Sequence, residues 1–217
     1  MDYSIYRYPV SLDMRARQCL IVGGGRVAER KARSLILAGA QVTIIATKVT
    51  ATIQAWSEER KCKILLREYR QGDVQKAFMV IAATDNSSVN AAVAAEATHN
   101  NCLLNVIDNP SLGNFAVLGT LRLGLLSFSV FGGGNPLLTR LLLKDLEQRY
   151  GVSLSAFVEF LTSARAQFKQ VEPDAQHRTA FWRKTLTSEQ LECILQGQVE
   201  EVKESIKHAI DGYRSQS

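Results

Sequence analysis

The sequence predicts an α/β chain: a parallel sheet covered by helices on both faces, then a small α+β region and a helical C-terminal domain. Short apolar runs alternate with helical patterns up to about residue 107. Two further apolar runs follow with no helix between them, and only helical periodicity remains from Ser153 onward. These changes of pattern divide the chain into predicted domains 1–112, 113–150 and 151–217.

The first domain contains five apolar runs of strand length, as expected of strands buried on both faces. The strands are expected at 18–23, 41–46, 61–66, 78–83 and 102–107. Apolar residues at helical spacing predict the intervening helices, at 26–38, 49–60 and 86–99. Gly39 is expected to end the first of these helices as a C-cap residue.

The second and third domains are expected to contain one hairpin and then helices. The runs 115–123 and 125–131 surround Gly124 and predict an antiparallel hairpin. Pro136 suits the first turn of the following helix. The tail is expected to form helical segments at 153–170, 175–186 and 188–212, with a break at Pro173.

The composition is that of an ordinary globular protein, with 217 residues, 46% hydrophobic and 22% charged. The four cysteines are far apart and form neither a CxxC pair nor a zinc-spaced cluster, so we expect buried thiols, no metal site and a cytoplasmic location. No leader-like or membrane-spanning apolar run is found. The net charge of +5 is spread along the chain, which argues against nucleic acid as a partner.

A glycine-rich turn between the first strand and the first helix is the main functional signal. It reads Gly23-Gly24-Gly25-Arg26-Val27-Ala28, a GxGxxA pattern. Gly23 would permit the tight turn, Gly25 the approach of a pyrophosphate, and Ala28 close packing of the helix on the sheet. The pattern predicts a Rossmann-like domain that binds a dinucleotide, although a glycine turn that merely connects packed elements is the alternative.

The ends of two other strands supply further candidate cofactor residues. No carboxylate follows the second strand. Thr47 could instead bond a ribose hydroxyl, and Lys48 could neutralise a 2′-phosphate. The residues therefore leave the choice between NAD and NADP open, with a slight preference for NADP. Thr84 and Asp85 follow the fourth strand, where ligands lie in such sheets. They could also cap the next helix, and both roles could hold at once.

Asp108 is the candidate acid–base residue. It follows the fifth strand in NVIDNP, where partial desolvation would raise the pKa of its carboxyl toward that of a general base. The alternative is a residue that starts the turn at Asn109-Pro110, and spacing alone weighs the two equally. The three histidines are expected at the surface or at helix ends.

Several motifs together resemble one family. The runs CLIVGGGRVAERKARSLILAGAQVT, VIAATDNSSVN, NVIDNP and GGGNPLLTRLLLKDLE resemble precorrin-2 dehydrogenase, which is also the N-terminal part of siroheme synthase. The resemblance covers residues 4–150 well and the helical tail more loosely. It implies NAD-dependent oxidation of precorrin-2 to sirohydrochlorin, with NAD rather than NADP.

The resemblance also implies roles for individual residues. It implies a catalytic role for Asp108 and, in some members, a role in iron chelation. It implies an intertwined homodimer with contacts around 111–149, and a helical tail that closes over the substrate. The implied cofactor contacts are Gly23, Gly24, Gly25, Arg26, Val27, Thr47, Lys48, Thr84 and Asp85.

The sequence departs from many relatives around the second glycine run. The stretch 130–136 reads VFGGGNP, so the phosphorylatable serine described in the family is missing. Two alternatives to a simple dehydrogenase remain: an enzyme that also inserts iron into sirohydrochlorin, and a non-catalytic module that senses dinucleotides. Methylation is not expected, because no methyltransferase domain is recognised in the chain.

Overall fold

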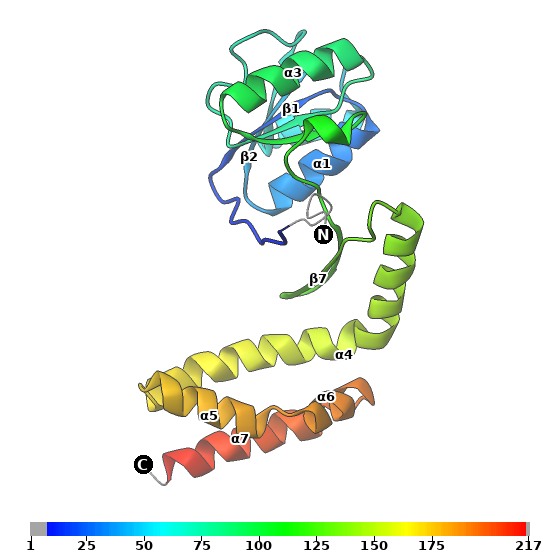
Figure 1. The fold of residues 1–217 in the computed structure, drawn as a ribbon. Helices are drawn as coiled ribbons and strands as arrows, with labels where there is room; N and C mark the ends of the chain where they lie inside the picture. Colours follow the sequence, from blue (N-terminus) through cyan, green and yellow to red (C-terminus); the bar gives the residue numbers. More distant parts are fainter. Residues whose placement is uncertain (1–7, 216–217) are drawn as a thin grey trace, which may run out of the picture. The chain divides into compact units, whose positions relative to one another are not determined.

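A computed structural model describes residues 8–215 of the chain (Figure 1). The chain divides into two compact units, Met1–Ala116 and Val117–Ser217. The further separation of 113–150 from 151–217 remains a proposal, and the two units are considered one at a time below.

Unit 1 is a five-stranded parallel sheet with the strand order β3-β2-β1-β4-β5. The expected strands and helices all occur, with ends shifted by at most two residues. The strands are β1 (Gln18–Val22), β2 (Gln41–Ala46), β3 (Cys62–Leu66), β4 (Met79–Ala82) and β5 (Leu103–Val106). The helices are α1 (Arg26–Leu37), α2 (Ala51–Glu58), α3 (Ser87–His99) and the short 3-10 turn η2 (Pro110–Leu112).

Alternate residues of the central strands enter two separate cores. Cys19 and Ile21 of β1 pack with α1 and α2 residues on one face of the sheet, whereas Leu20 and Val22 pack with α3 residues on the other. Side chains of a strand point alternately to opposite faces, so a strand covered on both sides must be apolar throughout. The apolar runs in the sequence reflect this two-sided burial.

Helix α1 ends as the sequence predicts. Gly39 follows the C-cap residue Ala38 with a φ of +78°, and the amide of Ala40 donates to the carbonyl of Leu35. A left-handed residue at this position favours glycine, because no Cβ is present to clash. Ala28, at the start of the helix, is fully buried, as close packing on the sheet requires.

Unit 2 begins with an antiparallel hairpin of β6 (Gly119–Leu123) and β7 (Leu126–Val130), which confirms the predicted two-stranded unit. Helix α4 (Pro136–Val171) follows. Asn135 caps it by accepting from the amides of Leu137 and Leu138, and Pro136 occupies the first turn, as predicted. Phe128 of the hairpin stacks on Tyr150 of α4 with ring centroids 5.1 Å apart.

Helix α4 bends sharply within its length, as Figure 1 shows. Gly151 has non-helical dihedrals at the bend, so the segment consists of two helices that meet there. The remaining helices are α5 (Ala175–Thr185), α6 (Ser188–Leu195) and α7 (Val199–Arg214). The single predicted segment at 188–212 is therefore wrong: Gly197, with a φ of +91°, separates two helices.

An aromatic cluster forms the core of the helical part of unit 2. Phe168 is fully buried and stacks on Phe181 at a centroid distance of 4.1 Å, while Trp182 and Tyr213 meet its ring edge-on. Such pairs stabilise a fold beyond their burial alone. Apolar residues of α4, α6 and α7 complete this core.

The four cysteines are free thiols; Cys19 and Cys102 are buried, and Cys62 and Cys193 are half-buried. Burial raises the pKa of the Cys19 thiol to about 11, which keeps it protonated and unreactive. Among the described residues, no helix has both the length and the hydropathy needed to cross a bilayer.

Candidate active site

The carboxyl ends of the central strands of unit 1 surround one crevice of about 940 Å³. In the order β3-β2-β1-β4-β5, the chain leaves β1 toward one edge of the sheet and later returns to its other side at β4. Ligands of open parallel sheets lie at such a switch point, outside the carboxyl ends of the strands. The crevice is thus where the topology places a ligand.

All nine cofactor residues predicted from the sequence line this crevice. They come from three separate segments: the turn after β1, the end of β2 and the end of β4. The residues are Gly23, Gly24, Gly25, Arg26, Val27, Thr47, Lys48, Thr84 and Asp85.

The three glycines of the turn differ in what a side chain would meet. A Cβ on Gly23, whose φ is +122°, would lie 2.3 Å from the carbonyl oxygen of Ala83, and one on Gly24 would lie 2.0 Å from that of Lys48. A Cβ on Gly25 would meet nothing within 4 Å. The first two glycines are therefore required by packing within the protein, whereas Gly25 borders open space in the crevice.

The N-terminus of α1 opens into this space. Gly25 is its N-cap residue and offers no capping side chain, so the first amides of the helix have no partner within it. Free amides and the positive end of the helix dipole bind phosphate oxygens. The exposed Arg26 adds a positive side chain at the same point.

Glu29 places one carboxylate close to this helix end, and its charge is already engaged. Thr50 donates to Glu29 Oε2 at 2.7 Å, and Arg33 lies 3.1 Å from Oε1. The hydrogen bond from Thr50, followed by that from Arg33, lowers the pKa of Glu29 despite partial burial. Thr50 also caps α2 and bonds the carbonyl of Gly24 through its amide, so it ties this carboxylate to the glycine turn.

The loop after β3 contributes crevice residues that the sequence did not point to, namely Arg67, Glu68 and Tyr69. Arg67 makes a bidentate pair with Asp73, with both N–O distances at 2.7 Å. The Tyr69 hydroxyl donates to Glu96 of α3. These contacts hold the loop at the edge of the crevice. The loop follows β3, the strand next to β2, and this position is the signal that could have identified its residues.

A buried asparagine joins the ends of β4 and β5. Asn90 of α3 is 1% exposed; its Nδ2 donates to Asp108 Oδ1 at 2.9 Å and to the carbonyl of Thr84 at 3.1 Å. Its Oδ1 accepts from the amide and the hydroxyl of Thr84. One side chain thus fixes both the proposed catalytic carboxylate and a crevice residue, and sequence reasoning missed it.

The pKa expected for Asp108 is wrong in direction. Asp108 is exposed, and hydrogen bonds from Ser87, then from Asn90 and from nearby backbone amides, lower its pKa below the ordinary value of 3.8 by more than partial desolvation raises it. Asp108 is therefore a fixed negative charge at neutral pH. The crevice lining ends at Ile107, the residue directly before it.

The alternative capping role of Thr84 and Asp85 is also wrong. Asn86 is the N-cap residue of α3, and its side chain accepts from the amides of Ser88 and Val89. The Asp85 side chain is exposed at the crevice. Among the residues that the structure describes, no group of three or more metal-ligating side chains is found.

Two family models match the chain. Residues 10–118 match the family described as "Putative NAD(P)-binding", and residues 153–210 match the one described as "Sirohaem synthase dimerisation region". The Rossmann-like sheet and the crevice at its switch point define a nicotinamide-dinucleotide-binding protein, and the chain belongs to this NAD(P)-binding family.

Similar curated proteins indicate the family within this class. The chain is 34% identical over 205 residues to siroheme synthase of Nitrosococcus oceani, covering 94% of this chain and 44% of that protein. It is 33% identical over 212 residues to siroheme synthase of Methylococcus capsulatus, covering 97% and 44%. Within the NAD(P)-binding class, the chain belongs to the siroheme synthase and precorrin-2 dehydrogenase family that its motifs predict.

The chain spans less than half of the length of these curated relatives. A solved structure titled "SirC, precorrin-2 dehydrogenase" has the same fold, with a TM-score of 0.79, 24% identity, and coverage of 93% of this chain and all of that one. The dimerisation match falls on 153–210, whereas the resemblance led us to expect dimer contacts around 111–149.

Proposed function

We propose that the chain oxidises precorrin-2 to sirohydrochlorin, with NAD bound in the crevice of unit 1. The reaction removes two electrons from the macrocycle: a hydride passes to NAD⁺, giving NADH, and a proton is released. The arrangement that carries this proposal is the crevice at the switch point, with an ionised carboxylate held beside it by Asn90.

The crevice residues suit a dinucleotide. The open space at Gly25 and the first amides of α1 would hold the pyrophosphate, and Arg26 would add a counter-charge. Thr47 and Lys48, both exposed after β2, would face the adenosine ribose, and Thr84 and Asp85 would lie toward the nicotinamide end. When bound, the nicotinamide ring accepts the hydride. The choice of NAD over NADP rests on the family resemblance.

The electrostatics of Asp108 suit a role as a charge stabiliser. Loss of a hydride leaves positive charge on the macrocycle, and a fixed carboxylate near the reacting carbon stabilises that charge. Because its pKa is lowered, Asp108 does not retain a proton at neutral pH, and the proton lost from the macrocycle passes on to water. Asn90 acts as a positioning residue that sets the direction of the carboxylate.

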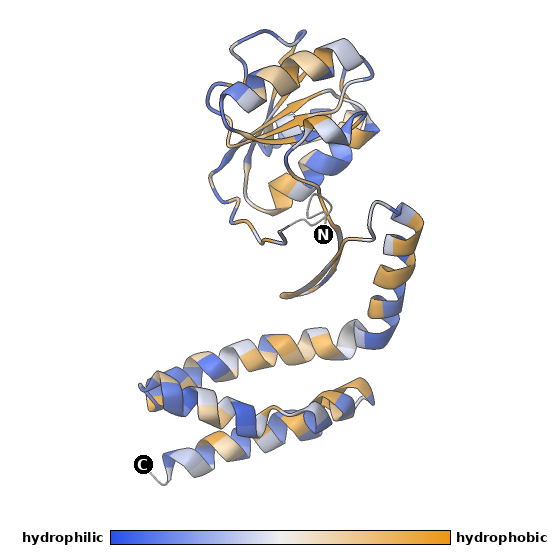
Figure 2. Ribbon diagram, in the orientation of Figure 1, coloured by the Kyte–Doolittle hydropathy of each residue, from blue (hydrophilic) through white to orange (hydrophobic). Residues whose placement is uncertain are grey.

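The proposed partner is a second copy of the chain. The dimerisation-region match supports a homodimer. Large apolar side chains are also exposed along the first half of α4, where Figure 2 shows a hydrophobic stripe. They are Leu137, Leu138, Leu141 and Leu142. Exposed apolar surfaces of this kind mark interaction sites, and we propose that these leucines contact the second copy. The cytoplasmic location stays a prediction.

The decisive experiment supplies the purified protein with freshly generated precorrin-2 and with NAD or NADP in separate arms. We expect the sirohydrochlorin spectrum and equimolar NADH in the NAD arm. Absence of product with either cofactor would contradict the proposal. An added Fe²⁺ arm measures siroheme formation above the uncatalysed rate, and so tests the bifunctional alternative. A sensing module would still bind NAD but would show no turnover.

A further inference from the structure

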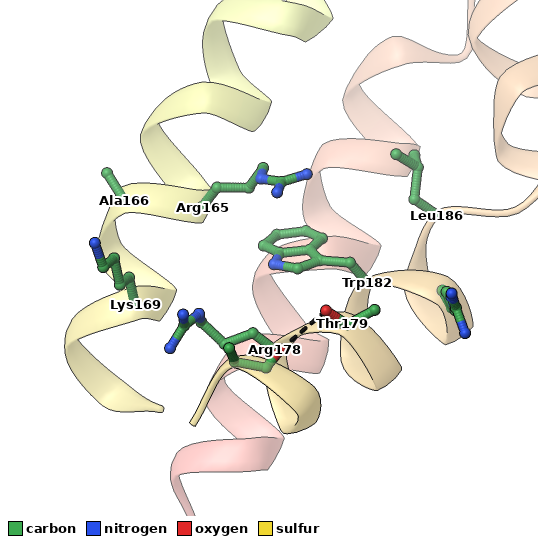
Figure 3. A pocket seen from close by; sticks show the side chains of 9 residues that line it. Arg165, Ala166, Lys169, Arg178, Thr179, Trp182 and Leu186 are labelled. Atoms are coloured by element: carbon green, nitrogen blue, oxygen red, sulfur yellow. Dashed lines mark hydrogen bonds between the residues drawn. The ribbon is translucent and has the colours of Figure 1, made fainter. Parts of the chain in front are cut away.

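A second pocket, of about 650 Å³, lies wholly within unit 2, where the last turns of α4 face α5 (Figure 3). Its lining is basic and aromatic. The charged residues are Arg165 and Lys169 of α4 with Arg178 and Arg183 of α5, and Trp182 supplies the aromatic surface. No acidic residue lines it. Neither the proposed cofactor residues nor Asp108 lines this pocket.

No acidic side chain in the described part of the chain neutralises the positive charge of the pocket. Among the described residues, none of the four cations makes an ion pair. Within residues 8–215, Arg178 is the only one of the four that hydrogen-bonds, and it donates to the backbone carbonyls of Glu172 and Pro173. Those carbonyls fix the guanidinium without removing its charge.

The two acidic side chains of the α4–α5 turn are engaged elsewhere. Glu172 accepts from the Tyr213 hydroxyl and from the Asp174 amide, and it lies 3.3 Å from His177. Asp174 caps α5 by accepting from two amides, both at 2.8 Å. Their pKa values are lowered, that of Glu172 chiefly by Tyr213 and that of Asp174 chiefly by the His177 amide. Neither carboxylate is therefore free to turn into the pocket.

Trp182 offers a flat surface that the core holds in place. Its ring meets Phe168 and Phe181 edge-on at centroid distances of 5.8 and 5.1 Å. The guanidinium of Arg165 lies 5.7 Å from its centroid, and Figure 3 shows this group directed toward the indole. An arginine beside an indole binds anionic groups while a flat ligand ring stacks nearby.

We infer that this pocket binds a planar polyanion, a flat ring that carries several carboxylates or phosphates. Guanidinium groups bind both anions through paired N–H donors. The volume lies within the range of roughly 300–1,000 Å³ that is usual for small-molecule sites. The source of such a ligand is either a tetrapyrrole polycarboxylate or a nucleoside polyphosphate. The inference does not depend on the oxidation proposed for unit 1.

Tryptophan fluorescence tests the inference directly, because the chain has two tryptophans and Trp56 lies in unit 1. In a Trp56→Phe background, emission reports on Trp182 alone. The chain is saturated with NAD to fill the crevice and is then titrated with uroporphyrin, with ATP and, as non-planar controls, with citrate and inorganic phosphate. We expect saturable quenching by at least one planar probe and markedly weaker binding of both controls.

Matched double variants locate the binding site. Arg165→Gln with Lys169→Gln removes two exposed cations of the pocket, and we expect affinity to fall by about tenfold or more. Arg140→Gln with Lys184→Gln removes the same charge from exposed positions outside the lining, and its affinity should stay close to that of the parent. Equal affinities in the two variants, or no saturable quenching by either planar probe, would overturn the assignment.

The two planar probes distinguish the ligand sources: binding of uroporphyrin alone supports a tetrapyrrole, and binding of ATP alone supports a nucleotide. The Arg183→Gln variant removes another cation of the same pocket, and its affinity for the planar probe should also fall. This variant is not expected to disturb the fold, because Arg183 is exposed and its side chain makes no hydrogen bond or ion pair among the described residues. If the oxidation assay failed but the quenching were specific, the proposed function would be wrong and the present inference would still hold.

Discussion

The carboxamide of Asn90 donates to the carboxylate of Asp108 at 2.9 Å and thereby ties the end of β5 to α3. The same side chain bonds both backbone groups of Thr84, at the end of β4. Buried polar groups require such partners, and removal of one partner leaves the others unsatisfied. Asn90 therefore contributes to the stability of the sheet edge and also positions the carboxylate that is proposed to act in the reaction.

Replacement Asn90→Ala should lower both stability and turnover. It leaves the amide and carbonyl of Thr84 without their partner, which costs about 1–3 kcal/mol of unfolding free energy. Chemical denaturation measures this loss. We expect kcat to fall by a larger factor than the affinity for NAD, because Asn90 does not itself line the crevice and affects it only through Thr84.

Thr84→Val provides the matched comparison for Asn90→Ala. It removes the hydroxyl that donates to Asn90 Oδ1 and that also bonds the backbone of Asn86, and it keeps the bond from Asn90 to Asp108. We expect it to retain more turnover than Asn90→Ala. If the two variants had the same kcat, Asn90 would not act through Asp108.

Asp108→Asn should remove turnover without removing the cofactor. The substitution keeps the size of the side chain but removes the charge, so we expect kcat to fall by about 10²–10³-fold, as for loss of other transition-state stabilisers. Calorimetric titration should give an unchanged Kd for NAD. A variant that kept its turnover would show that a group other than Asp108 is the catalytic one.

The pH dependence gives a separate test of Asp108. Its pKa is lowered, so the carboxylate is ionised at and above the unfolded value of 3.8, and its contribution is lost only as the pH falls through the lower folded value. The profile of kcat/KM should therefore show no acid limb from Asp108 between pH 5 and 7. A limb near pH 6 that disappears in Asp108→Asn would contradict the charge-stabiliser role.

Gly25→Val should abolish dinucleotide binding in a folded protein. The backbone of Gly25, with a φ of −82°, accepts a side chain, and a Cβ there meets no protein atom within 4 Å. The valine would instead fill the space proposed for the pyrophosphate. Titration with NAD should show no saturation, while the thermal transition stays close to that of the parent.

Gly24→Ala is the opposite case. Its Cβ would lie 2.0 Å from the carbonyl oxygen of Lys48, so the turn itself must move, and we expect a clearly lower Tm. Normal NAD binding by Gly25→Val would remove the cofactor assignment, whatever Gly24→Ala does.

The sheet could be predicted well from the sequence because burial on both faces requires a recognisable pattern of residues. Strands covered on both sides are continuously apolar, and the glycine turn is visible because packing excludes any larger residue at 23 and 24. Asn90 was missed because its role depends on α3 lying beside β5. One signal was available: Asn90 lies in helical register with the buried residues Val93, Ala94 and Ala97, and a polar residue in such a stripe needs a partner.

Two sequence-based expectations failed, for different physical reasons. The pKa of Asp108 was expected to rise by desolvation, but the amides and side chains around its turn donate hydrogen bonds that act more strongly in the other direction. The helix expected at 188–212 is interrupted because Gly197 adopts a left-handed conformation between α6 and α7. Hydrophobic periodicity continues across that break and does not reveal it.

The preference between NAD and NADP should depend on Lys48. No carboxylate follows β2, and the exposed ammonium group of Lys48 is the nearest candidate to pair with a 2′-phosphate. We expect Lys48→Gln to weaken NADP binding by several-fold while the Kd for NAD changes little. Titration of both cofactors measures this, and equal losses for both would place Lys48 at the pyrophosphate instead.

The exposed leucines of α4 provide the test of the proposed homodimer. Leu141 is 65% exposed, and Leu137, one helical turn before it, is 68% exposed. Leu141→Glu should place a charge in the middle of the stripe and shift the mass measured by light scattering from a dimer toward a monomer. Leu37→Glu, at a 75% exposed position in unit 1, is the matched control and should leave the mass unchanged. If Leu141→Glu stayed dimeric while substitutions within 153–210 gave monomers, the contact would lie in the segment that the dimerisation-region family matches.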